Sequence, residues 1–165
     1  MQTETPLKHA VAELAALLQD KGWTLVTAES CTGGMIASAC TDLAGSSAWF
    51  EGGVVSYSNS LKRKLLHVDA TTLASYGAVS EQTAQQMAVG ARQQSGADIS
   101  IATTGIAGPS GGVAGKPVGT VWFGWADANG VNAYCKHFTG NRAEVREQAT
   151  MFAIEVLIKH IKSSD

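Results

Sequence analysis

Ser30 is the residue in this sequence whose type and position most directly suggest a reaction. It lies in the stretch TAESCTGG (27–34), directly after an apolar run that is typical of a buried strand. At the start of a helix, a serine hydroxyl can attack a carbonyl carbon while unpaired backbone N–H groups stabilise the oxyanion. The same hydroxyl could instead cap the helix, with the glycines serving only the turn, and the pattern by itself favours that interpretation. The N–H groups expected as donors are those of Thr32, Gly33 and Gly34.

A serine nucleophile needs a base, and the stretch YSNSLKRK (57–64) offers Tyr57, Lys62 and Lys64. A lysine becomes a base when burial or a nearby positive charge lowers its pKa. Lys62 follows Tyr57 by five residues, so from a strand end or a first helical turn it could point back into a cleft. A solvated basic face is the commoner role of such a charge run, and sequence cannot show that Ser30 and Lys62 meet.

Cys31 is the competing nucleophile beside Ser30. A helix N-terminus would lower the pKa of its thiol. A cysteine nucleophile normally also needs a histidine, and the four histidines are scattered without a telling context. We therefore interpret Cys31 as a small packing residue. The three cysteines show no CxxC pairing, so we expect neither a disulfide framework nor a metal or other cofactor.

Two further segments could bind an anion. TGIAGPSGG (104–112) is Gly-rich and begins where a strand should end, so its N–H groups could meet a ligand at the carboxyl edge of a sheet. It is neither a Walker loop nor a dinucleotide fingerprint, and a mobile surface loop is an equally good interpretation. GNRAEVREQA (140–149) places Arg142 and Arg146 on one helix face. There they could clamp a phosphate or, more commonly, pair with glutamates.

The rest of the sequence alternates between predicted helices and strands. Helices are predicted over 7–21, 33–44, 60–68, 70–76 and 80–96 and from Asn141 on, and strands over 23–27, 48–58, 97–104, 118–126 and 131–138. Asn141 and Glu144 form a capping-box pattern. The apolar residues of the last helix form more than one stripe along its surface. We therefore expect neighbours to pack against two sides of this helix, for example a partner subunit on one of them. The fold class predicted is α/β, a three-layer α/β/α sandwich with a mixed sheet, as a single domain over residues 1–165.

Composition excludes several classes of protein. The 165 residues are 45% hydrophobic and 16% charged, as in an ordinary globular domain. The net charge of −2 argues against binding to nucleic acid or to an anionic membrane surface. No apolar run approaches the roughly 18 residues that span a bilayer, and the first ten residues lack a signal-peptide pattern. We expect a cytoplasmic enzyme or binding domain with reduced thiols.

Taken together, these segments resemble the C-terminal domain of the competence/damage-inducible CinA family, in particular its stand-alone nicotinamide-nucleotide amidases. The stretches that carry the resemblance span nearly the whole chain in order: TAESCTGG, AGSSAWFEGGVVSYSNSLKRKLL, YGAVSE, TTGIAGPSGG, KPVGTVWF and GNRAEVREQA. The resemblance implies hydrolysis of the carboxamide of nicotinamide mononucleotide to nicotinate mononucleotide and ammonia, in pyridine-nucleotide recycling. It also implies an α/β/α fold, a cytoplasmic location and a homodimer.

The resemblance also implies roles for individual residues. The family's proposed serine–lysine pair falls on Ser30 and Lys62, and Tyr57 would relay a proton or position Lys62. The Gly-rich loop and an arginine of the last motif would hold the 5′-phosphate of the substrate. Two rival hypotheses stay open: a non-catalytic nucleotide-binding module, and a thiol enzyme built on Cys31. The further substrate-binding positions implied are Thr104, Gly105, Ile106, Ala107, Gly108 and Arg142.

Overall fold

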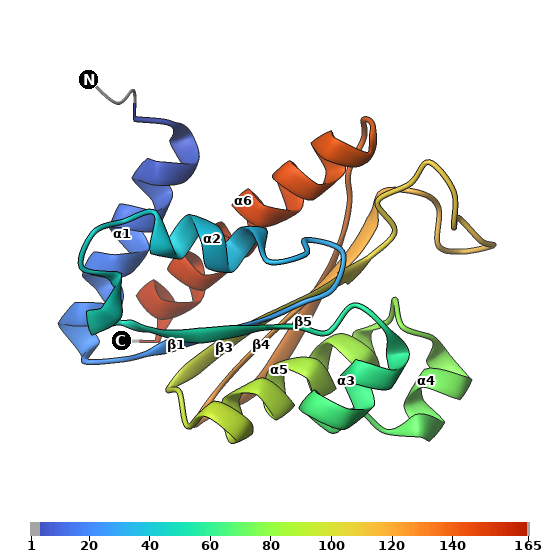
Figure 1. The fold of residues 1–165 in the computed structure, drawn as a ribbon, viewed down its shortest axis with the longest axis horizontal. Helices are drawn as coiled ribbons and strands as arrows, with labels where there is room; N and C mark the ends of the chain where they lie inside the picture. Colours follow the sequence, from blue (N-terminus) through green and yellow to red (C-terminus); the bar gives the residue numbers. More distant parts are fainter. Residues whose placement is uncertain (1–3, 165) are drawn as a thin grey trace.

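A five-stranded mixed sheet forms the centre of the molecule, with helices on both of its faces (Figure 1). The structure is a computed structural model in which residues 4–164 are described. The order across the sheet is β2-β1-β3-β4-β5, with β2, β1 and β3 parallel and the last two strands antiparallel. The predicted α/β/α sandwich with a mixed sheet is therefore confirmed. The strands are β1 (Leu25–Glu29), β2 (Phe50–Val55), β3 (Ile99–Gly105), β4 (Thr120–Asp127) and β5 (Gly130–His137).

The helices form two layers that Figure 1 separates clearly above and below the sheet. One layer holds α1 (Pro6–Lys21), α2 (Met35–Thr41) and α6 (Arg142–Ser163), and the other holds α3 (Asn59–Leu66), α4 (Ala70–Tyr76) and α5 (Glu81–Ser95). A short 3-10 helix, η1 (Ser46–Ala48), precedes β2. Among the described residues, no helix combines the length and the apolar character needed to cross a membrane.

The three parallel strands end at one edge of the sheet. Glu29, the last residue of β1, is in register with Val55 of β2 and Thr103 of β3. The segments that follow these strands, 30–34, 56–58 and 106–119, therefore leave the sheet side by side. Ligands of open α/β sheets bind at the carboxyl ends of the strands, so this edge is where a site is expected.

The turn between β1 and α2 differs from the sequence prediction. The strand expected over 23–27 lies at Leu25–Glu29, and the helix expected from residue 33 begins at Met35. Gly33 and Gly34 have φ values of +59° and +100°, a left-handed conformation that an α-helix cannot contain. The N-cap of α2 is Gly34, with no side-chain capping bond. The interpretation of Ser30 as an N-cap is therefore wrong.

A close helix–helix approach places the helix that carries Lys62. A Cβ added to Gly90 of α5 would lie 1.8 Å from the carbonyl oxygen of Leu66, at the end of α3. Only glycine allows this contact, because any side chain would overlap the α3 backbone. The Ser58 hydroxyl accepts a hydrogen bond from Leu61 N and so fixes where α3 begins. Both contacts direct the first turn of α3 toward the edge where β1 and β2 end.

The last helix is covered within its own chain. Its buried face packs against α1, α2 and strands β3 and β4, so the cover expected on two sides comes from α1 and the sheet, and the subunit suggested from the sequence is not needed for it. The capping box of Asn141 and Glu144 is present as predicted. The apolar side chains of α6 that are buried are Val145, Ala149, Ala153, Ile154, Leu157, Ile158 and Ile161.

Candidate active site

Ser30 and Lys62 meet at the carboxyl edge of the parallel strands. Lys62 Nζ lies 2.9 Å from Ser30 Oγ, and it also donates to the backbone carbonyls of Ser56 and Tyr57, each at 2.9 Å. Ser30 follows β1, whereas Lys62 comes from the first turn of α3 on the other side of the loop that follows β2. The fold thus joins two residues that sequence spacing could not connect.

Burial favours the neutral form of the Lys62 amine. The residue is 1% exposed, and this burial lowers the pKa of its amine from 10.5 to about 8, partly opposed by the nearby Cys31 sulfur. Among the described residues, no carboxylate forms an ion pair with Lys62. Removing an amine from water without offering an opposite charge favours its neutral form. The neutral form is the one that can accept the Ser30 proton.

The backbone carbonyls around the Lys62 amine orient the lone pair of its neutral form. A neutral lysine amine has two hydrogens and one lone pair, and the two carbonyl oxygens can take both hydrogens. The lone pair then faces the Ser30 hydroxyl. Ser30 Oγ also lies 3.5 Å from the Tyr57 carbonyl, a longer contact than the one to Lys62. The geometry therefore favours transfer of the Ser30 proton to Lys62.

The turn that follows Ser30 leaves some backbone donors free and uses others. Gly33 N–H donates to the Ser30 carbonyl, so the expected contribution of Gly33 to an oxyanion site is lost. Within the described chain, the N–H groups of Thr32 and Gly34 donate to no protein group. Both are therefore available to a developing oxyanion.

Glu29 and Arg146 are site residues that the sequence reasoning missed or set aside. Glu29 is 1% exposed and accepts from Thr32 Oγ1 at 2.7 Å and from Ile36 N at 2.9 Å. Arg146 Nε donates to the Cys31 carbonyl at 3.0 Å, on the same turn. A carboxylate at the end of a short buried strand was the available signal for Glu29, because a buried charge needs dedicated partners.

Arg142 and Arg146 start from one helix face but contact different segments. Arg142 Nη1 donates to the Gly108 carbonyl at 2.9 Å and so lies against the Gly-rich loop. Arg146 contacts the turn after Ser30 instead. The structure therefore brings Arg142 and the loop together, as the phosphate-site prediction requires. Arg146, which the sequence analysis paired with Arg142 as a possible phosphate clamp, lies in a different environment.

Within the Gly-rich loop, several of the expected binding groups are already occupied. The Thr104 hydroxyl is buried and donates to the Ala78 carbonyl at 2.7 Å. Both backbone groups of Ile106 bond to the segment 119–120, and Ala107 is 5% exposed. Gly105 ends β3 and cannot carry a Cβ, which would meet Val121 and Thr120. These positions shape the loop, whereas the N–H groups of Ala107 and Gly108 donate to no group in the described chain.

Tyr57 and Cys31 lie next to the Ser30–Lys62 pair, but Tyr57 is exposed whereas Cys31 is buried. Tyr57 contributes its carbonyl to Lys62, while its residue surface is 61% exposed, so its phenol lies at the rim. Cys31 is buried, and this burial raises the pKa of its thiol to about 11 despite opposing effects from its own backbone, Lys62 and Arg146. A thiol with that pKa is protonated at neutral pH and is a poor nucleophile.

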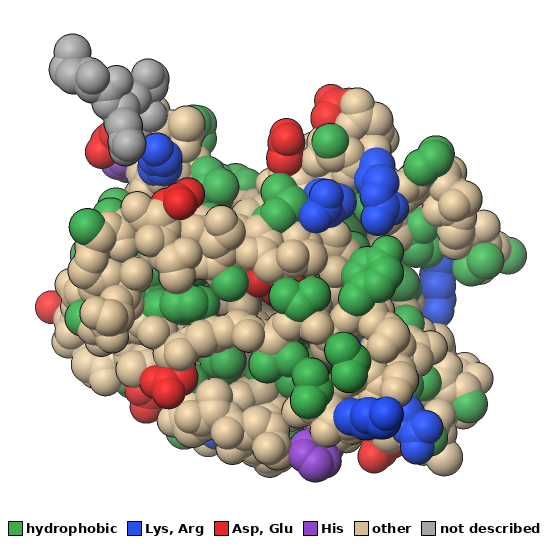
Figure 2. Space-filling model, in the orientation of Figure 1, with side chains coloured by type: hydrophobic (Ala, Val, Ile, Leu, Met, Phe, Trp, Pro, Cys, Tyr) green, Lys and Arg blue, Asp and Glu red, His purple; other side chains and the backbone are tan. Residues whose placement is uncertain are grey.

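The surface around the pair combines positive and apolar groups. Figure 2 shows Lys and Arg side chains beside the N-terminal end of α6 and hydrophobic side chains exposed over the loop between β2 and α3. Val55 and Tyr57 are the exposed apolar residues of that loop region, at 48% and 61%. An anionic group near α6 and a flat ring near the loop would both find suitable neighbours here.

Comparison with known proteins gives one consistent result. The family model for the CinA C-terminal domain matches residues 7–161. The nicotinamide-nucleotide amidohydrolase PncC of Enterobacter agglomerans is 50% identical over 158 residues, covering 95% of this chain and 96% of that protein. PncC of Escherichia coli K12 is 47% identical and covers 94% of each chain.

Solved structures agree with these sequence relatives. The crystal structure of a CinA superfamily protein from Klebsiella pneumoniae superposes with a TM-score of 0.92 at 41% identity, covering 95% of this chain and 98% of that one. The competence/damage-inducible protein from Agrobacterium tumefaciens gives a TM-score of 0.91 at 42% identity, with 96% and 98% covered. The chain belongs to the CinA C-terminal domain family.

Proposed function

We propose that this protein is a nicotinamide-nucleotide amidohydrolase, which hydrolyses the carboxamide of nicotinamide mononucleotide to nicotinate mononucleotide and ammonia. The observation that carries the proposal is the 2.9 Å contact between Ser30 Oγ and a buried Lys62 amine whose pKa is lowered to about 8. The relatives named PncC, about half identical over nearly their full length, support the choice of substrate. The enzyme class is amide hydrolase, acting through a serine nucleophile.

The first half-reaction forms an acyl-enzyme. Neutral Lys62 takes the proton of the Ser30 hydroxyl as Oγ attacks the carboxamide carbon, and the C=O electrons move to the oxygen. The oxyanion is held by the N–H groups of Thr32 and Gly34. When the tetrahedral intermediate collapses, Lys62 returns the proton to the amide nitrogen and ammonia leaves. The result is an ester between Ser30 and the nicotinoyl group.

The second half-reaction reverses these roles with water. Lys62, neutral again after ammonia has left, takes a proton from a water molecule that attacks the ester carbonyl. Collapse of the second intermediate breaks the bond to Ser30 Oγ, and Lys62 gives its proton to that oxygen. Nicotinate mononucleotide is released with its carboxylate ionised. The remaining proton of the product acid goes to solvent. Lys62 is neutral again after each half-reaction, and Ser30 regains its hydroxyl proton at the end of the second.

The remote phosphate of the substrate would orient the amide. Arg142 and the free N–H groups of the Gly-rich loop form the proposed 5′-phosphate site, with Arg142 tied to the loop through the Gly108 carbonyl. Binding energy from a group that does not react can be used to align the one that does. The exposed Tyr57 ring is placed at the rim, where we propose that it lies beside the pyridinium ring.

One experiment tests the proposed function directly. Purified protein is incubated with nicotinamide mononucleotide and a chelator, and ammonia and nicotinate mononucleotide are measured together. Equal amounts of both products support the proposal. Binding of the nucleotide by calorimetry with no product would instead indicate a non-catalytic nucleotide-binding module, and activity lost in Cys31→Ala but kept in Ser30→Ala would indicate a thiol enzyme.

We also propose that the protein is a cytoplasmic homodimer that works in pyridine-nucleotide recycling. Membership of the CinA family supports these points. Light scattering on the purified protein would give the mass of the particle, and a mass equal to one chain would contradict the dimer.

A further inference from the structure

Glu29 is a buried carboxylate with an unusually complete set of hydrogen-bond donors. Its oxygens accept from the hydroxyls of Thr27 (3.1 Å) and Thr32 (2.7 Å) and from the backbone N–H groups of Ile36 (2.9 Å) and Ala37 (3.0 Å). No Lys, Arg or His within residues 4–164 forms an ion pair with it. The charge of Glu29 is therefore balanced only by dipoles, two of them at the start of α2.

This arrangement removes the start of α2 from the reaction. The first turn of a helix offers unpaired N–H groups that favour an anion, and those of Ile36 and Ala37 point at Glu29 instead of at a ligand. The N–H groups of the first turn of α2 are thus unavailable to an oxyanion, because that of Met35 donates to the Thr32 carbonyl. The donors that remain belong to the turn 31–34, so the precise path of that turn decides the reaction.

Glu29 also holds this turn directly. The Thr32 hydroxyl donates to Glu29 and lies 2.8 Å from Thr103 Oγ1, while Ser30 N–H donates to the Thr103 carbonyl at 3.0 Å. These contacts tie the residues on both sides of the Ser30 side chain to β1 and β3. From the other side, Arg146 bonds to the Cys31 carbonyl. The turn is held between a buried anion and a cation from α6.

We propose that Glu29 is a positioning residue for Ser30: through Thr32 and the first N–H groups of α2, it fixes the turn that aims the nucleophile and its oxyanion donors. Glu29 itself touches neither Ser30 Oγ nor Lys62. The inference rests on the proposed function for its catalytic consequence. Its structural basis is the network of Glu29, Thr32 and Thr103 at the end of β1.

Glu29→Gln is the most direct test. Glutamine has the same shape, but its amide NH₂ would face N–H and O–H donors where the carboxylate oxygen accepts. We expect kcat for nicotinamide mononucleotide to fall about 10- to 100-fold while KM changes less than about threefold, because the phosphate site is untouched but the attacking geometry is not. An unchanged kcat in folded Glu29→Gln, or a rise in KM alone, would overturn the inference.

Thr32→Val keeps the charge and removes the hydroxyl that links Glu29 to Thr103, so it provides a second test if Glu29→Gln does not fold. Ser100→Ala is its matched control, because Ser100 is also a fully buried hydroxyl, which donates to the Ala88 carbonyl at 2.6 Å in the same sheet. At similar thermal stability, we expect Thr32→Val to lose about 3- to 10-fold in kcat and Ser100→Ala to lose none. Equal losses in both variants would show a merely structural role and overturn the inference.

A serine-directed fluorophosphonate separates this inference from the proposed function, because its reaction needs an aimed Ser30 but no nucleotide substrate. Wild-type protein should be labelled at Ser30, with Oγ displacing fluoride at phosphorus, and Glu29→Gln should be labelled at least about tenfold more slowly. Labelling at equal rates would overturn the positioning role even where the amidase activity is absent. Wild-type labelling without hydrolysis of the nucleotide would overturn the proposed substrate, and slower labelling of Glu29→Gln would still support the role of Glu29. Absence of wild-type labelling at Ser30 would contradict both.

Discussion

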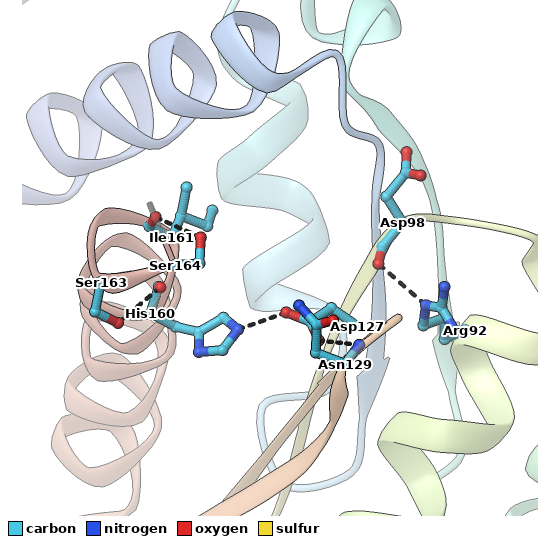
Figure 3. Close-up of polar contacts among 8 residues, drawn as sticks. All are labelled: Arg92, Asp98, Asp127, Asn129, His160, Ile161, Ser163 and Ser164. Carbon is cyan, nitrogen blue, oxygen red and sulfur yellow. Dashed lines mark hydrogen bonds and ion pairs between the residues drawn. The ribbon is translucent and has the colours of Figure 1, made fainter.

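Two polar side-chain pairs at opposite ends of the sheet show how the surroundings decide the use of a titratable group. At one end, Lys62 meets Ser30 at 2.9 Å and has no carboxylate partner. At the other end, His160 of α6 meets Asp127 of β4 at 2.7 Å (Figure 3). Asn129 N–H also donates to Asp127, where the chain turns into β5.

The two pairs differ in whether an opposite charge is supplied. Burial alone would raise the pKa of Asp127, but the hydrogen bonds from His160 and from the backbone of Asn129 outweigh it and lower that pKa. The His160–Asp127 pair has its hydrogen bond formed, and it joins α6 to the β4–β5 hairpin. Lys62 is buried without such compensation, and the pKa of its amine falls to about 8. A complementary charge makes a structural link, whereas its absence favours the neutral amine that the proposed base requires.

Removing either member of the Ser30–Lys62 pair should give the largest effect. We expect Ser30→Ala and Lys62→Ala each to lower kcat at least about 10³-fold, and the double variant to lose little more, because the two groups act as a unit. Ammonia release under saturating substrate measures this, with circular dichroism as the check on folding. Near-normal turnover in either single variant would remove the pair from the mechanism.

Placing a carboxylate beside Lys62 should give the Ser30–Lys62 pair the opposite charge that the His160–Asp127 pair already has. The Cys31 sulfur is close enough to Lys62 that each affects the other's pKa. In Cys31→Asp, an acidic group there should raise the pKa of Lys62 and lower kcat/KM at pH 8 about 10- to 100-fold. Cys31→Ser is the matched control and should keep most of the activity. A fully active Cys31→Asp protein with an unchanged pH profile would contradict our account of Lys62.

The pH dependence of the wild-type enzyme should report the same amine. In the proposed mechanism only neutral Lys62 accepts the Ser30 proton, so kcat/KM should rise about tenfold per pH unit below its pKa and level off above about 8. Initial rates between pH 6 and 9.5 in buffers of constant ionic strength would show this limb. A rate that falls over this interval would point to a protonated lysine as the working form.

Burial of Lys62 should also cost stability. Because its pKa is near 8 in the folded protein and 10.5 when exposed, the unfolded chain binds more protons between these values. Stability should therefore rise with pH over that interval. Lys62→Met keeps the length without the charge, and at pH 7 we expect it to raise the free energy of unfolding by about 1 to 3 kcal/mol. Denaturant titrations at pH 7 and above pH 10 should show this gain shrinking at high pH, and a destabilised variant at pH 7 would contradict it.

Breaking the second pair should have the smallest effect and none on the reaction. His160→Gln should lower the free energy of unfolding by about 0.5 to 1.5 kcal/mol, because Asp127 loses a hydrogen-bond partner. The pKa of Asp127 is lowered in the folded state, so the stability that it contributes is present above its ordinary value near 3.8 and is lost as the pH falls below it. Thermal unfolding at pH 7 and pH 3 measures both points, while kcat should stay unchanged.

The sequence by itself determined the fold class, the family and the candidates for the chemistry. Alternation of helix and strand patterns predicted the α/β/α sandwich, and the Asn141–Glu144 capping box is present where expected. These predictions are correct because each depends on residues that are neighbours in the chain. The resemblance of six stretches to one family identified Ser30 and Lys62 as a pair.

Only the tertiary structure decided what those candidates do. Whether Lys62 meets Ser30, loses its charge or faces two carbonyls depends on α3 packing against α5 at Gly90 and on β1 and β2 ending at one edge. The left-handed glycines 33 and 34 moved the helix start away from Ser30, and Glu29 occupied that start. A pKa or a hydrogen bond between distant segments depends on burial and approach in three dimensions, which residue spacing along the chain does not contain.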